Sequence, residues 1–227
     1  MPAARPIFSK EIFQFFRQLG RHNKKVWMDA NRERYQQTVV LPFRRLLEEL
    51  SPTVLKLDER FDALGRRGAN FSRINRDIRF AKDKTPYRTQ MYLKFSAPLP
   101  GEMKSGQLYT GISADSVTVG FRVYAEPKRR LSSIALIAEP RIAANPQWLA
   151  RQKKRLGNKY QSYWYASVKG DWTKNDGWPT AADWPKLQGW IVRKKLAAAA
   201  ATRNSFPSDV GKIFCDLYPL LKFTALE

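Results

Sequence analysis

The first 60 residues carry apolar side chains at the spacing of amphipathic helices. Two runs show the pattern most clearly: Ile12, Phe13, Phe16 and Leu19, and then Phe43, Leu46, Leu47 and Leu50. The members of each run recur every three or four positions and therefore line one face of a helix. Ser9 and Gly20 stand where the first helix would begin and end. Pro42 fits the first turn of the later helix, and Ser51-Pro52 is expected to end or kink it. A helical layer is thus predicted over about 8–60.

From Phe71 onward the hydrophobic period changes to two. The polar positions of the stretch 71–80 include Arg73, Asn75, Asp77 and Arg79. A strand would gather these side chains on one face and turn Ile74, Ile78 and Phe80 toward the core. Similar patterns predict further strands over 90–95, 107–113, 117–124, 160–168 and 190–196. Asp115-Ser116 lies where a tight turn would join two of them.

Helical spacing returns in 131–138 and 147–156, and a closing helix is expected at about 205–222. Helices before and after a strand-rich region of about 70–196 predict an α+β fold. In this fold, a mostly antiparallel sheet packs with N-terminal and C-terminal helices. No Gly/Ser-rich linker interrupts the chain, so we expect a single domain over residues 1–227.

Charge is the feature of the composition that bears most on function. The chain of 227 residues holds 41 Lys and Arg against 20 Asp and Glu, a net charge of +21. Residues 1–100 hold 21 of the basic and 10 of the acidic residues, so the charge is spread over the body and is not carried by a tail. A positive body attracts polyanions in a salt-sensitive way. The alternative is a charged surface that only provides solubility.

Several classes of protein do not fit the sequence. No apolar stretch is long enough to span a bilayer and no apolar export signal is evident at the start, so we expect a cytoplasmic protein without a membrane partner. Cys215 is the only cysteine, which leaves no internal disulfide, and its apolar neighbours predict a buried, inert thiol. His22 is the only histidine, so a His/Cys zinc site is not expected. The sequence specifies no cofactor and no oligomeric state.

The most informative stretch is basic and runs from Arg73 to Tyr87. Its charged residues are Arg73, Arg76, Arg79, Lys82 and Lys84 against Asp77 and Asp83. Guanidinium groups bind phosphate or carboxylate in a bidentate manner, and a carboxylate between arginines holds their planes in position. We therefore predict a ligand-binding site for a phosphate-bearing or other anionic ligand, with a nucleotide or nucleic acid as candidates. The alternative is an edge strand that is protected by charge.

Catalysis is the second hypothesis for this stretch. Asp77 or Asp83 would then serve as a base or metal ligand for a phosphorylated or carboxylated substrate. Lys84 and the arginines would stabilise developing negative charge, and Tyr87 would donate a proton. A third hypothesis is an interaction module in which the motif only locks the sheet.

The same segment resembles the defining motif of a family of conserved hypothetical proteins, a domain of unknown function found in bacteria and, within longer chains, in fungi. The pattern R-x-x-R-D-x-R-F followed by D/N-K-x-x-Y is met by Arg73, Arg76, Asp77, Arg79, Phe80, Asp83, Lys84 and Tyr87. The opening helix, the series 23–42 and the strands over 109–121 are similar too, so the resemblance covers most of the chain. Met28 departs from it where an aromatic residue is common. The resemblance implies no known activity.

Two aromatic clusters remain. In the first, Asn23, Trp27, Asn31 and Tyr35 step by four residues and so lie on one helical face. Trp27, Asn31 and the adjacent Arg32 are candidate ligand-binding residues, with Asn23 as a helix cap. Packing of Trp27 in the core is the alternative. The second is a series with a step of six: Trp172, Trp178, Trp184 and Trp190. In an extended chain these rings would share one face and stack on bases or sugars, whereas the favoured interpretation is hydrophobic anchoring of a long loop.

Overall fold

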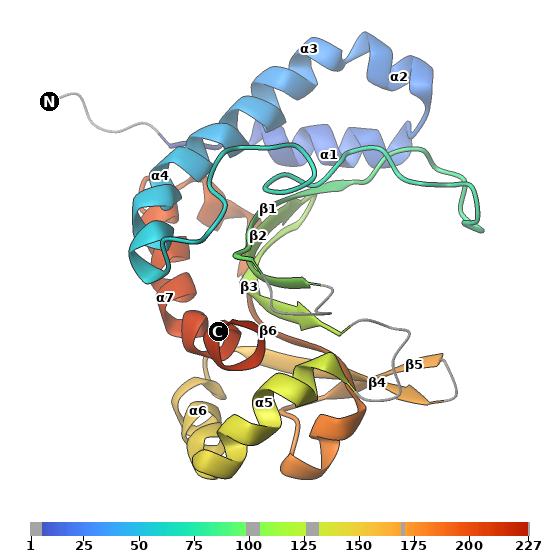
Figure 1. Ribbon diagram of the computed structural model, residues 1–227. Coiled ribbons are helices and arrows are strands. Elements are labelled where there is room, and N and C mark those ends of the chain that lie inside the picture. Colours follow the sequence, from blue (N-terminus) through green and yellow to red (C-terminus); the bar gives the residue numbers. More distant parts are fainter. Residues whose placement is uncertain (1–5, 99–104, 126–131, 169–170, 227) are drawn as a thin grey trace, which may run out of the picture. The chain divides into compact units, whose positions relative to one another are not determined.

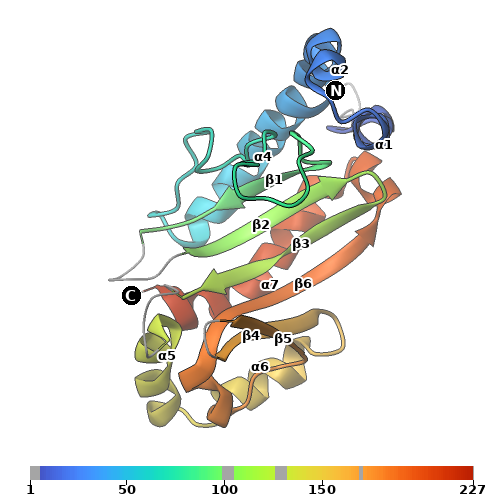
Figure 2. The same ribbon diagram turned by 90° about the vertical axis from the view of Figure 1, so that its right-hand side faces the viewer.

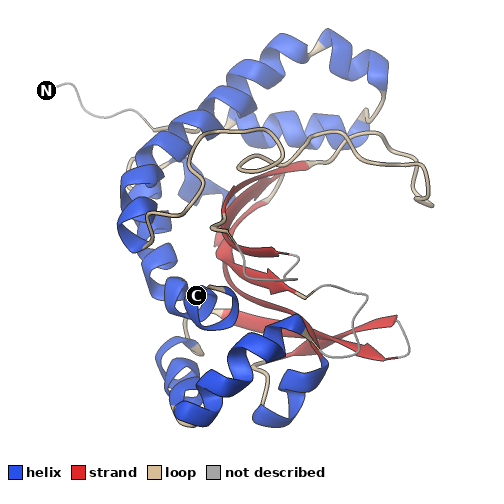
Figure 3. Ribbon diagram, in the orientation of Figure 1, coloured by secondary structure: helices blue, strands red, loops and turns tan. Residues whose placement is uncertain are grey.

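The computed structural model describes residues 6–98, 105–125, 132–168 and 171–226 (Figure 1). It contains a six-stranded antiparallel sheet with strand order β1-β2-β3-β6-β4-β5, whose strands Figure 2 labels. Helices make up much of the remaining chain (Figure 3). The predicted α+β class is therefore confirmed.

Contacts between Cα atoms group the chain into two compact units. Unit 1 consists of Met1–Phe95, Thr110–Thr118 and Lys195–Gly211. Unit 2 consists of Ser96–Tyr109, Val119–Lys194 and Lys212–Glu227. The single domain over 1–227 stays a prediction. Among the described residues, no helix has both the length and the apolar character that crossing a membrane requires.

Unit 1 begins with the predicted helical layer. Helix α1 spans Glu11–Arg21, α2 spans Lys25–Ala30, and α3 at Arg32–Tyr35 leads through a π-helical turn, η1 at Gln36–Val40, into α4 at Leu41–Leu57. Pro42 lies in the first turn of α4 as predicted, but this helix continues past Pro52 to Leu57. The core packs around Phe8, whose ring meets Phe43 and Phe206 edge to face at centroid distances of 5.3 and 5.9 Å. These contacts join the N-terminal helical layer to the start of the closing helix.

The predicted strand over Phe71–Phe80 is wrong. The chain between α4 and β1 is irregular, and its only bridges among the described residues are isolated pairs such as Phe71 with Leu93 and Asn75 with Tyr87. Ile74 is buried as the alternation requires, but Phe80 is 96% exposed. Local hydrogen bonds explain the difference, because the Asp77 carboxylate accepts from the Arg79 amide. Such side-chain bonds compete with a strand ladder for the backbone.

The other predicted strands are present. In chain order they are β1 at Gln90–Phe95, β2 at Ser105–Ser113, β3 at Ser116–Tyr124, β4 at Gln161–Val168 and β6 at Leu187–Ala197. The sequence did not predict β5 at Asp171–Asp176, which pairs antiparallel with β4. Its Asp and Asn residues and its polar outer positions disfavour a strand in isolation.

The later helices also follow the predicted places. Helix α5 spans Ser133–Ala144 and α6 spans Trp148–Leu156, while η2 at Ala181–Lys186 and η3 at Ala198–Thr202 are short 3-10 helices and α7 spans Phe206–Ala225. The predicted start of α5 at Leu131 lies outside the described residues. Cys215 of α7 is exposed, so the predicted buried thiol is wrong. Ile213, Phe214 and Leu217 form the buried stripe of α7, and Cys215 falls between them on the opposite side of the helix.

The tryptophan series does not lie on one extended face. Trp184 and Trp190 are 1% and 0% exposed, and the ring of Trp190 meets those of Trp178 and Trp184 edge to face at 5.3 and 5.8 Å. The anchoring interpretation therefore describes these three residues, although they anchor β6 and η2 and not a long loop. Trp172 lies on β5 and is 38% exposed.

Candidate functional site

The basic motif forms a loop that stands on a short two-stranded base. We call residues 73–88 the arginine loop; it lies between α4 and β1 in the chain (Figure 1). The amide of Arg76 donates to the carbonyl of Pro86, and the amide of Arg88 donates to the carbonyl of Ile74, both at 2.8 Å. These bonds flank the bridge between Asn75 and Tyr87. The base thereby holds residues 77–85 as an exposed tip.

Asn23 fastens this base to the helical layer. Its Nδ2 donates to the carbonyl of Tyr87 at 2.8 Å, and its Oδ1 accepts from the amide of Tyr87 at 3.0 Å. Asn23 is therefore not the predicted helix cap, a position that Lys24 holds without a side-chain bond. The amide side chain reproduces the two bonds of a neighbouring strand, which a sequence pattern does not reveal because 64 residues separate the partners.

Arg76 is held inside the loop by Asp83 and Thr85. One guanidinium nitrogen contacts the Asp83 carboxylate and the Thr85 hydroxyl, and it also donates to the Thr85 carbonyl at 3.2 Å. Asp83 in turn accepts from the amide and from the hydroxyl of Thr85, each at 2.9 Å. The Thr85 amide, and after it Arg76, lowers the pKa of Asp83 to about 2. Asp83 is thus ionised and weakly basic at neutral pH.

Arg79 forms a second, more exposed pair with Asp77. Its Nε and Nη2 donate to the two carboxylate oxygens at 3.0 and 2.7 Å, and the Arg79 side chain lowers the pKa of Asp77. The side chains are 76% and 61% exposed, a setting in which ion pairs contribute little to stability. Lys84 donates to the carbonyls of Ile78 and Arg79 at 3.0 and 3.4 Å, which closes the tip.

The remaining cations of the loop have no such partners. Arg73, Lys82 and Arg88 are exposed, and within the described part of the chain none of their side chains has a hydrogen bond or an ion pair. Phe80 is 96% exposed, and the Arg79 guanidinium carbon lies 6.0 Å from its ring centroid. The arginine loop therefore presents cations without acidic partners, and its tip presents an exposed aromatic ring.

The other predicted site residues do not join the tip. Tyr87 is only 5% exposed. Trp27 is half-buried and packs against Phe15 at 5.6 Å between ring centroids, and its role in ligand binding stays a prediction. Asn31 donates to the carbonyl of Trp27 at 2.9 Å, and Arg32 donates to Asp29 at 2.9 Å. The second cluster thus bonds locally.

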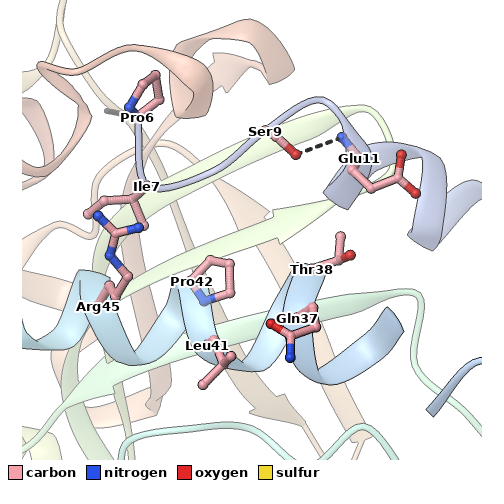
Figure 4. Close-up of a pocket in the computed structure, with 9 residues that line it drawn as sticks. All are labelled: Pro6, Ile7, Ser9, Glu11, Gln37, Thr38, Leu41, Pro42 and Arg45. Carbon is pink, nitrogen blue, oxygen red and sulfur yellow. Dashed lines mark hydrogen bonds between the residues drawn. The ribbon is translucent and has the colours of Figure 1, made fainter. Parts of the chain in front are cut away.

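A pocket that the sequence does not predict lies elsewhere in unit 1. It has a volume of about 370 Å³, and its lining residues come from the segment before α1, from α1, from η1 and from α4 (Figure 4). Glu11 and Arg45 are its charged residues, and Glu11 already accepts from Arg34 Nε at 2.8 Å. None of the predicted site residues lines it. Within the described residues, no three His, Cys, Asp or Glu side chains are grouped to hold a metal ion.

Comparison with protein families places the chain. The model of the conserved hypothetical protein family DUF2461 matches residues 11–223. The chain belongs to this family. The DUF2461 match includes the arginine loop and the whole sheet, so both are parts of the family's domain. A search of curated proteins finds no match, and an assignment of function to this DUF2461 chain has to come from its site.

Proposed function

We propose that the arginine loop binds a phosphate-bearing polyanion, with nucleic acid as the foremost candidate. The observation that carries the proposal is the charge of the arginine loop. Residues 73–88 hold six basic residues against two acidic ones, and Arg73 and Lys82 have no partner within the described residues. A concentration of unmatched cations on one loop attracts phosphates and releases their counterions.

The form of the loop favours an extended ligand over a small one. The pocket described in unit 1 has no lining residue from the loop, whereas the side chains of Arg79 and Asp77 are open to solvent. A phosphate that approaches Arg79 replaces a weak surface ion pair with a charge-assisted contact of the same bidentate geometry. Asp77 therefore orients the guanidinium before the ligand arrives.

Phe80 adds a reason to favour nucleic acid among polyanions. A ring that is 96% exposed gains nothing from its own fold, and stacking on a base would cover it. The catalytic hypothesis has less support, because an Asp83 carboxylate with a pKa of about 2 is a poor general base near neutral pH.

The salt dependence of binding tests the proposal. We would measure the affinity for a fluorescein-labelled single-stranded oligonucleotide by anisotropy over a series of salt concentrations. The double variant Arg73→Ala/Lys82→Ala removes two of the three unpartnered cations of the loop and is expected to reduce the slope of log affinity against log salt by about 1.4, since each phosphate contact on a single strand contributes about 0.7.

The matched control is Lys56→Ala, which removes an exposed cation of α4 in the same unit. This variant should change the slope by less than about 0.7, the contribution of one phosphate contact on a single strand. A double variant with the native slope would refute the role of the loop, as would the absence of binding by the native protein at low salt.

A further inference from the structure

A second surface with the chemistry of ligand binding lies on the sheet of unit 2. Strand pairing sets Tyr163 opposite Asp176 and Tyr165 opposite Lys174. Trp172 lies two residues before Lys174 on β5. Side chains on directly opposed residues, and on every second residue, share one face of a sheet. On the other face of these strands, Trp164 and Trp190 are buried. The polar and aromatic residues thus occupy the face turned away from that core.

The aromatic rings on this face form a continuous layer. Trp172 stacks on Tyr124 of β3 at a centroid distance of 6.1 Å and an angle of 27°, and it meets Tyr165 at 5.8 Å. Tyr165 meets Tyr163 at 6.0 Å. We call Tyr124, Tyr163, Tyr165 and Trp172 the aromatic face.

A glycine lets the layer lie close to the sheet. A Cβ atom at Gly189 would stand 2.6 Å from the ring of Tyr124, a distance that a side chain does not tolerate. The Tyr124 ring therefore rests directly on the backbone of β6, and the flat side of the layer is held in place.

Two cations lie over the same rings. The Arg193 guanidinium carbon is 5.0 Å from the centroid of Tyr163, and Lys174 Nζ is 4.8 Å from it. Lys174 pairs with the exposed Asp176. Arg193 has no carboxylate partner within the described residues, and its Nε is buried with no hydrogen-bond partner there. Arg193 is thus a positioned guanidinium whose charge is not neutralised.

The exposure of the face shows that it is not simply core. Trp172 is 38% exposed, Lys174 is exposed, and the three tyrosines are half-buried. Rings that are fixed yet partly open to solvent, next to an unneutralised guanidinium, match the two needs of an unpaired nucleotide. The base stacks on an aromatic ring, and the phosphate pairs with arginine. A duplex buries its bases and offers no such stacking.

We propose that the aromatic face binds single-stranded nucleic acid by stacking of unpaired bases on Trp172 and the tyrosines, with Arg193 contacting the phosphate. This surface belongs to unit 2 and the arginine loop belongs to unit 1, so the inference does not depend on the loop. The net charge of +21 complements such a ligand, whereas a neutral sugar chain would leave the Arg193 charge unused.

A comparison of two oligonucleotides isolates stacking from charge. We would measure anisotropy with a labelled thymidine 15-mer and with an abasic strand of the same length and charge. The native protein is expected to bind the thymidine strand on the order of 10-fold more tightly, and Trp172→Ala is expected to remove most of this preference. Arg193→Gln should lower the affinity for both strands and reduce the salt slope by about 0.7.

The controls separate this surface from the loop and from misfolding. Arg73→Ala/Lys82→Ala should change the salt slope and keep the preference for bases, so the two proposals can fail independently. Far-UV circular dichroism and Tm verify the fold of each variant, and Tyr165→Leu replaces Trp172→Ala if the latter unfolds. Equal affinity of the native protein for both strands would overturn the proposal. Tighter binding of a neutral oligosaccharide than of the thymidine strand would overturn it as well.

Discussion

The two hydrogen bonds between the Asn23 side chain and the Tyr87 backbone give the most direct test of how the arginine loop is held. Asn23→Ala removes both hydrogen bonds, at 2.8 and 3.0 Å, and leaves a partly buried amide and carbonyl of Tyr87 without their partner. Each bond contributes about 0.5–1.5 kcal/mol net, so the variant should lose about 1–3 kcal/mol of unfolding free energy. For a chain of this size, a loss of about 2 kcal/mol corresponds to a decrease in Tm of about 4–8 °C.

Urea unfolding followed by circular dichroism measures the loss, and hydrogen exchange locates it. The amide of Tyr87 should exchange faster in the variant, because its acceptor is gone. Asn175→Ala is the control, since it removes a single exposed bond to the Thr173 carbonyl and should cost less than about 0.5 kcal/mol. An Asn23→Ala variant as stable as this control would refute the reasoning, because water would then satisfy the Tyr87 amide and carbonyl without a loss of unfolding free energy.

Three further outcomes follow from other residues. The folded pKa of Asp83, about 2, lies below the ordinary value of 3.8, so Asp83 should contribute stability above about pH 4 that is lost as the pH falls toward 2. The difference in Tm between the native protein and Asp83→Asn should shrink over this range. A constant difference in Tm would contradict this prediction. Gly189→Ala should lower the unfolding free energy by about 1–3 kcal/mol through the clash with Tyr124. Gly20 lies within α1, and a Cβ atom there would lie 3.6 Å from the Thr89 side chain. Gly20→Ala should therefore be neutral or stabilising in the same urea titration. The exposed Cys215 thiol should react with a colorimetric thiol reagent without denaturant, and a need for urea would contradict the structure.

The regular elements were predictable because their hydrophobic period is local information. Helix α1 and strands β1 and β3 bury the residues that the spacing of 3.6 or two selects. The arginine loop misled the same reasoning, because Arg73, Asp77 and Arg79 alternate with apolar residues without pairing to a neighbouring strand. Hydrogen bonds of Asp77 and Asp83 to nearby amides shape the loop instead.

The candidate sites show the same division. The charge of the loop is visible in the sequence, but the pairing of Arg76 with Asp83 and the exposure of Phe80 depend on the turn at the tip. The aromatic face was beyond sequence reasoning, because its rings come from β3, β4 and β5. Only strand register brings Trp172 beside Tyr124 and Tyr165. The regular step of six suggested that all four tryptophans share one face. In the structure, Trp190 contacts Trp178 and Trp184, whereas Trp172 contacts Tyr124 and Tyr165.

The division into two units has a consequence for how this protein can be dissected. The polypeptide passes between unit 1 and unit 2 five times, at positions within β2, β3, β6 and α7 and at the end of β1. Neither unit is a contiguous stretch, so no truncation from one end isolates either of them. A continuous fragment that contains all of unit 1 also contains residues 96–109 and 119–194, which belong to unit 2. Function must therefore be assigned by point substitution in the intact chain, and a protease nick at one crossing is expected to weaken both units together.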